Sequence, residues 1–295
     1  MLKHNTFVKT IPNRVVVMGA GGFVGASLVK NLYENKIPFL ALTEKNMNLF
    51  DAEASDRLSN ILHPYDTLVV ISAIAPCKNN EMLLQNISMM KAVCDAIEKK
   101  QPKHLIYLSS DAVYADRPNP LTETSNAEPG SIHGIMHLCR EIMLKQVCSV
   151  PMAILRPSLL YGAEDTHNGY GPNQFLRLAF SNKEITLFGE GEERRDHVYI
   201  DDLVNLLRLI ILHYSEGVLN IATGTAVSFR EIAEMVSEYF NPPTIINTIP
   251  RLVPMPHNGY RPFDNSASLA SFPDFRYTTL ADGIEKTFRR LKSKS

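Results

Sequence analysis

The chain has 295 residues, a formal net charge of −1 and 45% hydrophobic residues. This near-neutral charge excludes the strongly basic surface that nucleic acids or anionic membranes would require. The four cysteines lack a CxxC spacing, and neither a signal-peptide core nor an apolar run of about 18 residues is present. We therefore expect a reduced, soluble, cytoplasmic protein that does not bind nucleic acid or insert into a membrane.

Short apolar runs recur along the first half of the chain. They lie at 14–18, 39–43, 67–72, 104–109 and 152–156. Continuous runs of this length suit strands that are buried on both faces of a parallel sheet. Amphipathic helical patterns such as 25–34 and 81–99 separate them. This alternation predicts an α/β fold built on a Rossmann-type doubly wound parallel sheet.

The composition changes after Arg156, where Pro, Gly and Asn become frequent and the elements become short. A helical pattern at 201–212 and an apolar run at 217–222 then indicate a return to the sheet. We predict a dinucleotide-binding lobe from residues 1–160 and 197–223. A smaller substrate lobe is predicted from residues 161–196 and 224–295.

A glycine-rich loop follows the first apolar run. Gly19, Gly22 and Gly25 form a GxxGxxG pattern that leads into a helix. Glycine permits the tight turn and lets backbone N–H groups approach a pyrophosphate at the positive end of the helix. An ordinary glycine-rich turn is the structural alternative, but the strand before and the helix after favour a dinucleotide.

The second apolar run ends at Thr43, Glu44 and Lys45, where this type of fold places a ribose-binding acid. Glu44 can accept the 2'-hydroxyl of NAD, whereas Lys45 can bind the 2'-phosphate of NADP. Neither the loop nor the strand end offers an arginine, which favours NAD over NADP. A solvated turn without a ligand remains an alternative here.

Six motifs, in order, resemble those of the extended short-chain dehydrogenase/reductase superfamily, specifically the NAD-dependent epimerases and dehydratases that modify nucleotide sugars. They are GAGGFVG at 19–25, DTLVVISA at 66–73, LSSDAVY at 108–114, HGIMHLCRE at 133–141, RPSLLYG at 156–162 and ITLFGEGEERRDHVYIDD at 185–202. The resemblance covers nearly the full chain. It implies a Rossmann fold, NAD as cofactor, a nucleotide-diphosphate sugar as ligand, and it is compatible with a homodimer.

The resemblance also implies which residues contact the cofactor, with the adenosine near the second strand and the nicotinamide near the third. They are Gly19, Gly22, Phe23, Val24, Gly25, Thr43, Glu44, Asn48, Leu49, Ser72, Ala73, His137 and Pro157.

For the substrate, the resemblance implies that Ser110 hydrogen-bonds the reacting sugar oxygen and that Asn173 is a further contact. Arg195 matches an arginine that grips the diphosphate, and Arg261 resembles a second one. A guanidinium suits this role because it binds phosphate oxygens in a bidentate fork. An ion pair of Arg195 with Asp196 or Asp201 is the structural alternative.

The sequence departs from the family at the catalytic motif, Tyr-x-x-x-Lys. His133 stands at the tyrosine position and His137 at the lysine position. In the family, the tyrosine transfers a proton while the lysine binds the ribose and lowers the tyrosine's pKa. A histidine titrates near pH 6.5, so His133 can carry the proton, with Asp111 or a water completing a relay. His137 can still hydrogen-bond the ribose.

Two other readings of the histidines are open. A metal pair is disfavoured because HGIMH lacks the glutamate of HExxH and no third ligand is identifiable, so we predict no metal.

Asp111-Ala112 also lacks the Asp-Glu pair of the 4,6-dehydratases, which argues against elimination of water. We predict an NAD(P)-dependent epimerase or ketoreductase acting on a sugar carbon of a nucleotide sugar. The alternative is an inactive NAD(P)-binding sensor or scaffold that has lost the Tyr/Lys pair.

Overall fold

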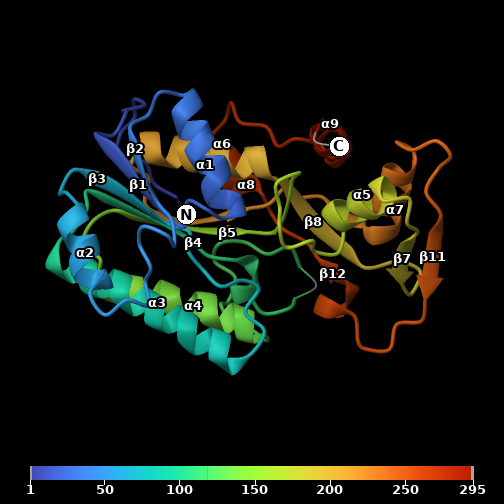
Figure 1. Ribbon diagram of the computed structural model, residues 1–295, viewed down its shortest axis with the longest axis horizontal. Coiled ribbons are helices and arrows are strands. Elements are labelled where there is room, and N and C mark those ends of the chain that lie inside the picture. Colours follow the sequence, from blue (N-terminus) through green and yellow to red (C-terminus); the bar gives the residue numbers. More distant parts are fainter. Residues whose placement is uncertain (1, 118, 294–295) are drawn as a thin grey trace. The chain divides into compact units, whose positions relative to one another are not determined.

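The computed structural model describes residues 2–117 and 119–293, and it divides into two compact units (Figure 1). The first unit comprises Met1–Ala115, Glu123–Pro157 and Leu203–Ile221. The second unit comprises Asp116–Thr122, Ser158–Asp202 and Ala222–Ser295.

The first unit is built on a six-stranded sheet in the order β2-β1-β3-β4-β5-β9. Every adjacent pair is parallel. The strands are β1 (Arg14–Met18), β2 (Phe39–Leu42), β3 (Asp66–Val70), β4 (His104–Leu108), β5 (Met152–Pro157) and β9 (Gly217–Ile221). The predicted Rossmann-type parallel sheet is therefore confirmed, and the order reverses between β1 and β3, the switch point where such folds bind ligands.

Helices cover both faces of this sheet (Figure 1). On one face, α3 packs between α2 and α4, and α1 and α6 lie on the other. Their bounds are α1 (Phe23–Glu34), α2 (Ala54–Ile61), α3 (Asn80–Lys99), α4 (Ile132–Val147) and α6 (Ile200–Leu212), and a short 3₁₀ turn, η1 (Asp111–Val113), follows β4. The strands are buried on both faces, which explains their nearly continuous apolar sequences.

The second unit consists of short elements. In it β8 pairs with β6, β10 and β12, and β7 pairs with β11. Its strands are β6 (Leu159–Tyr161), β7 (Ile185–Phe188), β8 (Arg194–Tyr199), β10 (Ala226–Ser228), β11 (Ile246–Ile249) and β12 (Tyr260–Arg261). Its helices are α5 (Pro172–Phe180), α7 (Phe229–Ser237), α8 (Ser266–Ser271), α9 (Leu280–Lys292) and the 3₁₀ segment η2 (Pro256–Gly259).

The boundaries between the units differ from the predicted lobes. Residues 116–122, 158–160, 197–202 and 222–223 group with the second unit, although the sequence pattern placed them in the first lobe. The physical reason is strand pairing: β6 pairs with β8, and Leu121 forms a bridge with Phe263. No helix within the described ranges is long and apolar enough to cross a membrane.

Candidate active site

At two positions of the loop after β1, the backbone conformation or a close contact requires glycine. Gly19 has a φ of +90°, which favours glycine, and a Cβ there would lie 2.6 Å from the backbone nitrogen of Ser72. A Cβ on Gly25 would lie 2.8 Å from the Cα of Ala20, because α1 packs directly against the loop. These two glycines fix the turn and its contact with the end of β3.

Gly22 is different, because neither its conformation nor its neighbours require glycine. Its φ is −84°, and the nearest atom to a Cβ would be the Gly19 carbonyl oxygen at 3.7 Å. It precedes α1, whose N-terminus has no side-chain cap and no acidic residue in its first turn. The N–H groups of Phe23, Val24 and Gly25 therefore lack the usual partners, and this open, electropositive space fits a pyrophosphate.

The residues predicted to contact the adenosine lie around the end of β2. Thr43 donates its backbone N–H to Asn46 Oδ1 at 2.7 Å, and Glu44 is exposed. Asn48 is held by Asp51 at 2.9 Å, and Leu49 belongs to the hydrophobic core of the unit. The side chains of Asn48 and Leu49 thus serve the local turn and the core, and their contact with a cofactor stays a prediction.

The residues predicted at the nicotinamide follow β3 and end β5. Ala73 is half-buried and Pro157 is buried. Ser72 accepts a hydrogen bond from Arg140 Nη2 through its carbonyl oxygen, at 2.6 Å. Its own hydroxyl is buried and has no hydrogen-bond partner among the described residues. A buried hydroxyl without a partner is uncommon, and a polar ligand would satisfy it.

The N-terminus of α4 positions the two histidines. Ser131 caps the helix by accepting a hydrogen bond from the N–H of Gly134 at 3.1 Å. A Cβ on Gly134 would lie 2.6 Å from the Cβ of Pro129 and would also meet the Ala112 carbonyl. The close contact brings the first turn of α4 against η1, so that His133 lies near Asp111.

His133 is half-buried, and burial lowers its pKa below 6.5 although Asp111 opposes the shift. The backbone N–H of Cys77 donates to its Nδ1 at 3.3 Å. Because Nδ1 accepts, neutral His133 carries its proton on Nε2. In this state the ring offers a donor rather than a free lone pair.

His137 is only 5% exposed, and its ring centroid lies 4.8 Å from that of His133. Its Nδ1 lies 2.9 Å from the hydroxyl of Tyr107, a fully buried residue of β4. Burial, together with the positive charges of a protonated His133 and of Arg140, holds the pKa of His137 well below 6.5. Position 137 therefore carries no positive charge at neutral pH, in contrast to the lysine of the family motif.

Ser110 and Asp111 complete this group. The Ser110 hydroxyl accepts from the N–H of Ala112 at 3.2 Å and donates to Asp111 at 3.4 Å. Beneath them, Glu141 of α4 accepts from Ser109 at 2.6 Å and from Arg156 at 2.6 Å. This buried network ties α4 to β4 and β5, so the predicted catalytic residues Ser110, Asp111, His133 and His137 are brought together in the first unit.

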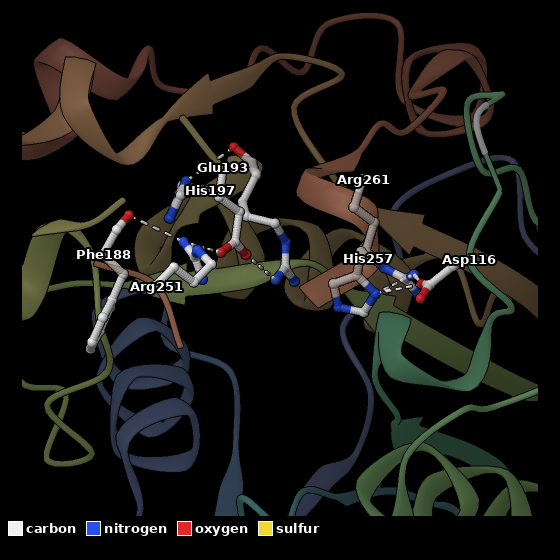
Figure 2. Close-up of polar contacts among 8 residues, drawn as sticks. Asp116, Phe188, Glu193, His197, Arg251, His257 and Arg261 are labelled. Carbon is white, nitrogen blue, oxygen red and sulfur yellow. Dashed lines mark hydrogen bonds and ion pairs between the residues drawn. The ribbon is translucent and has the colours of Figure 1, made fainter. Parts of the chain in front are cut away.

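The second unit contains a group of arginines around Glu193, shown in Figure 2. Glu193 is 5% exposed and lies 3.6 Å from Arg195 and 3.4 Å from Arg251. Two guanidinium groups thus share one carboxylate. The Nε of Arg251 is buried and has no hydrogen-bond partner within the described chain.

Arg261 belongs to a second group of the same unit (Figure 2). Its Nη1 lies 2.5 Å from Asp116 and 3.0 Å from His257. Burial and the charges of Arg195 and Arg261 lower the pKa of His257, which keeps it neutral. Because the charge of Arg195 acts on His257, the two predicted phosphate-binding arginines lie in one electrostatic environment.

Arg195 and Asn173, two of the predicted substrate contacts, have partners within the second unit. Arg195 pairs with Glu193, whereas Asp196 accepts from Thr223 at 2.9 Å. The amide oxygen of Asn173 accepts from the N–H of Gly162 at 3.0 Å, and its amide nitrogen donates to Asp165 at 2.5 Å. Its contact with a substrate therefore stays a prediction.

Sequence reasoning also missed several residues of these sites. Glu193 and Arg251 are far apart in the chain and carry no motif, so no sequence signal paired them. Arg140 was detectable, since it follows His133 and His137 on the same helical face. Across the described ranges, no group of three or more His, Cys, Asp or Glu residues could hold a metal ion.

Comparison with known proteins places these features in context. The model of the NAD dependent epimerase/dehydratase family matches residues 15–222 and confirms the resemblance. An uncharacterised UDP-glucose epimerase of Bacillus subtilis is 21% identical, covering 95% of this chain and 98% of that protein. A putative UDP-glucose 4-epimerase of Methanocaldococcus jannaschii is 24% identical, covering 75% of this chain and 81% of the relative.

Solved structures share the fold at low identity. A UDP-glucose 4-epimerase of Thermus thermophilus in complex with NAD superposes with a TM-score of 0.82 at 20% identity, covering 96% of this chain and all of that one. A UDP-glucuronic acid 4-epimerase of Bacillus cereus, in complex with UDP-glucuronic acid and NAD, gives a TM-score of 0.80 at 20% identity, covering 96% of this chain and 100% of the other.

Proposed function

Because the chain belongs to the NAD-dependent epimerase/dehydratase family, we propose that it binds NAD and acts as an epimerase on a nucleotide-diphosphate sugar. The observation that carries the proposal is the loop after β1. There Gly22 leaves open space before an uncapped helix, and the buried Ser72 hydroxyl beside the loop lacks a partner in the described chain. The relatives named as UDP-glucose epimerases support the substrate class.

NAD, when bound, supplies a hydride acceptor for a sugar carbon. The chain's own residues would then hold the sugar and manage the proton. Ser110 lies in a half-buried position where its hydroxyl can meet a sugar oxygen, and Asp111 and His133 lie nearby. For His133 to accept a proton, its Nδ1 must release the N–H of Cys77, or the ring must exchange the proton between its nitrogens.

Arg195 and Arg251 are the proposed grip on the diphosphate. They share Glu193, so a diphosphate can replace this weak, long carboxylate contact with charge-assisted hydrogen bonds. Arg261 would support them from the neighbouring group around Asp116. Two guanidinium groups at one place favour a ligand with two negative phosphates over a neutral sugar.

Calorimetry with NAD, UDP and UDP-glucose tests the binding part of this proposal. Arg195→Ala should weaken UDP binding by about 1.5 to 3 kcal/mol, as expected for hydrogen bonds to a charged group. Arg276→Ala is the matched control, because Arg276 is an exposed arginine of the same unit that, among the described residues, bonds only the backbone carbonyls of Pro273 and Phe275. Equal UDP affinity in the parent and Arg195→Ala would assign Arg195 a structural role and contradict the proposed grip.

A second function, an NAD-binding sensor without turnover, is favoured by the state of the histidines. Both are neutral, and both Nδ1 atoms are engaged within the protein. This candidate predicts tight NAD binding with no conversion of nucleotide sugars. Gain of turnover in a variant that combines His133→Tyr with His137→Lys, from an inactive parent, would support it over the epimerase.

A further inference from the structure

Arg140 is a fully buried charge on the inner face of α4. Its Nη2 donates to the Ser72 carbonyl oxygen at 2.6 Å, and its Nη1 lies 3.8 Å from the sulfur of Met136. Its Nε has no hydrogen-bond partner, and it forms no ion pair, within residues 2–117 and 119–293. The guanidinium therefore lacks the carboxylate that usually accompanies a buried arginine.

Folding alone does not account for this residue. Burying a charge without an opposite charge is strongly unfavourable, and a well-packed apolar side chain in its place is often neutral or stabilising. The same face of α4 carries Met136 and Leu144 at buried positions. An arginine at position 140 thus costs stability that an apolar residue would not.

The groups around Arg140 carry no opposite full charge, although its guanidinium carbon lies 5.4 Å from the centroid of the Tyr107 ring. Burial raises the pKa of Tyr107 and of Cys94 to about 12 each, so both stay neutral at pH 7. His137 is neutral as well. Glu141, the next residue of the helix, is already paired with Arg156 at 2.6 Å.

The position of this charge relates it to the cofactor loop. Ser72, whose carbonyl Arg140 holds, follows β3, and its backbone nitrogen lies against the position that a Cβ of Gly19 would take. In a doubly wound sheet, a dinucleotide crosses the carboxyl ends of the strands at the switch point, here between β1 and β3. A dinucleotide bound there would extend from the half that contains β1 and β2 to the half that contains β3 and β4.

We propose that Arg140 supplies the fixed positive charge of this site and thereby favours the reduced, uncharged nicotinamide over the oxidised cation. The inference rests on the proposed binding of NAD. The oxidised ring carries a positive charge that the reduced ring lacks, so a nearby cation repels only the oxidised form. In α4 the buried positive charge therefore lies at Arg140, one turn beyond the neutral His137.

The matched variants Arg140→Gln and Arg140→Lys separate charge from hydrogen bonding. Both side chains can donate to the Ser72 carbonyl, but glutamine can never carry the charge, whereas lysine carries it when protonated. The measurement is the dissociation constant of NAD⁺ divided by that of NADH, for the parent and each variant at pH 7.5. We expect the ratio to fall about tenfold or more in Arg140→Gln and to stay near the parent value in Arg140→Lys.

An unchanged ratio in Arg140→Gln would overturn the inference. Arg140→Met replaces the glutamine variant if that variant does not unfold cooperatively. The neutral variant should melt at no lower temperature than the parent, whereas a large loss of stability with an unchanged ratio would assign Arg140 a structural role. If the parent binds neither form of the cofactor, the proposed function itself fails and this inference falls with it.

Discussion

His133 and His137 lie one turn apart on α4, but they differ in burial and in the groups that they contact. His137 is almost fully buried and tied to Tyr107, which fixes its orientation and keeps it neutral. His133 is half-buried and lies near Asp111, so it can meet both a ligand and a carboxylate. Of the two, His133 is the better candidate for transferring a proton.

Replacement of His133 by phenylalanine tests this assignment. If His133 accepts the substrate proton, only its neutral form is active, and its lowered pKa keeps it neutral at pH 6.5 and above. Oxidation should therefore hold its rate above pH 6.5 and decline only at lower pH. His133→Phe should reduce turnover about 100-fold or more with little change in NAD affinity. A variant that keeps the parent's rate and pH profile would exclude His133 as the proton carrier.

Replacement of Gly22 tests whether the loop after β1 binds the cofactor. Gly22→Val adds a side chain where the protein leaves open space, so the fold should be retained while NAD binding is lost. Gly169→Val is the control, since a Cβ at Gly169, which belongs to the second unit, meets nothing within 4 Å. Calorimetry with NAD on both variants gives the result, and undiminished affinity in Gly22→Val would remove the loop from the binding site.

At the scale of elements, α4 depends on one close contact at its first turn. Gly134 lets the helix approach η1 and Pro129, and Ser131 caps the free N–H groups there. Glu141 then secures the middle of the helix to β4 and β5 through Ser109 and Arg156. These contacts place His133 and His137 more firmly than helix propensity could.

Gly134→Ala should therefore destabilise the protein, although alanine is the better helix former. The added Cβ would clash with Pro129 and the Ala112 carbonyl, at an expected cost of about 1 to 3 kcal/mol. Urea unfolding measures this cost, with Gly130→Ala as control because a Cβ at Gly130 meets nothing within 4 Å. Equal stability of both variants would show that η1 moves freely away from α4.

The elements were largely predictable, whereas the contacts between distant residues were not. The six predicted strands of the sheet correspond to β1 to β5 and β9, because buried parallel strands leave unbroken apolar runs. The bonds from Cys77 to His133 and from Tyr107 to His137 join residues distant in the chain, and they fix which ring nitrogen is available. No local pattern encodes such pairings, and the same holds for Glu193 with Arg251.

At the scale of the whole molecule, buried histidines make stability depend on pH. Burial lowers the pKa of His104 to about 4 and that of His197 to about 3, and His137 is shifted in the same direction. All three are neutral in the folded state, whereas in the unfolded chain they take up protons near pH 6.5. The unfolded state thus binds more protons as the pH falls below 6.5.

We expect the free energy of unfolding to be unaffected by these groups above pH 6.5 and to fall between about pH 6.5 and 4. Each histidine contributes up to about 1.4 kcal/mol per pH unit within that window. Urea unfolding at a series of pH values measures the slope. A stability that stays constant from pH 7 to 4.5 would contradict the neutral, buried state of these histidines.

The most direct test of the proposed function is epimerisation itself. The purified protein is incubated with NAD and a panel of nucleotide sugars, including UDP-glucose and UDP-glucuronic acid, and the products are followed by NMR. We predict conversion of at least one of them to its 4-epimer, with the rate reduced about 100-fold or more in His133→Phe. Tight NAD binding without conversion of any sugar, in a parent that gains turnover with His133→Tyr and His137→Lys, would contradict the epimerase and identify a binding protein.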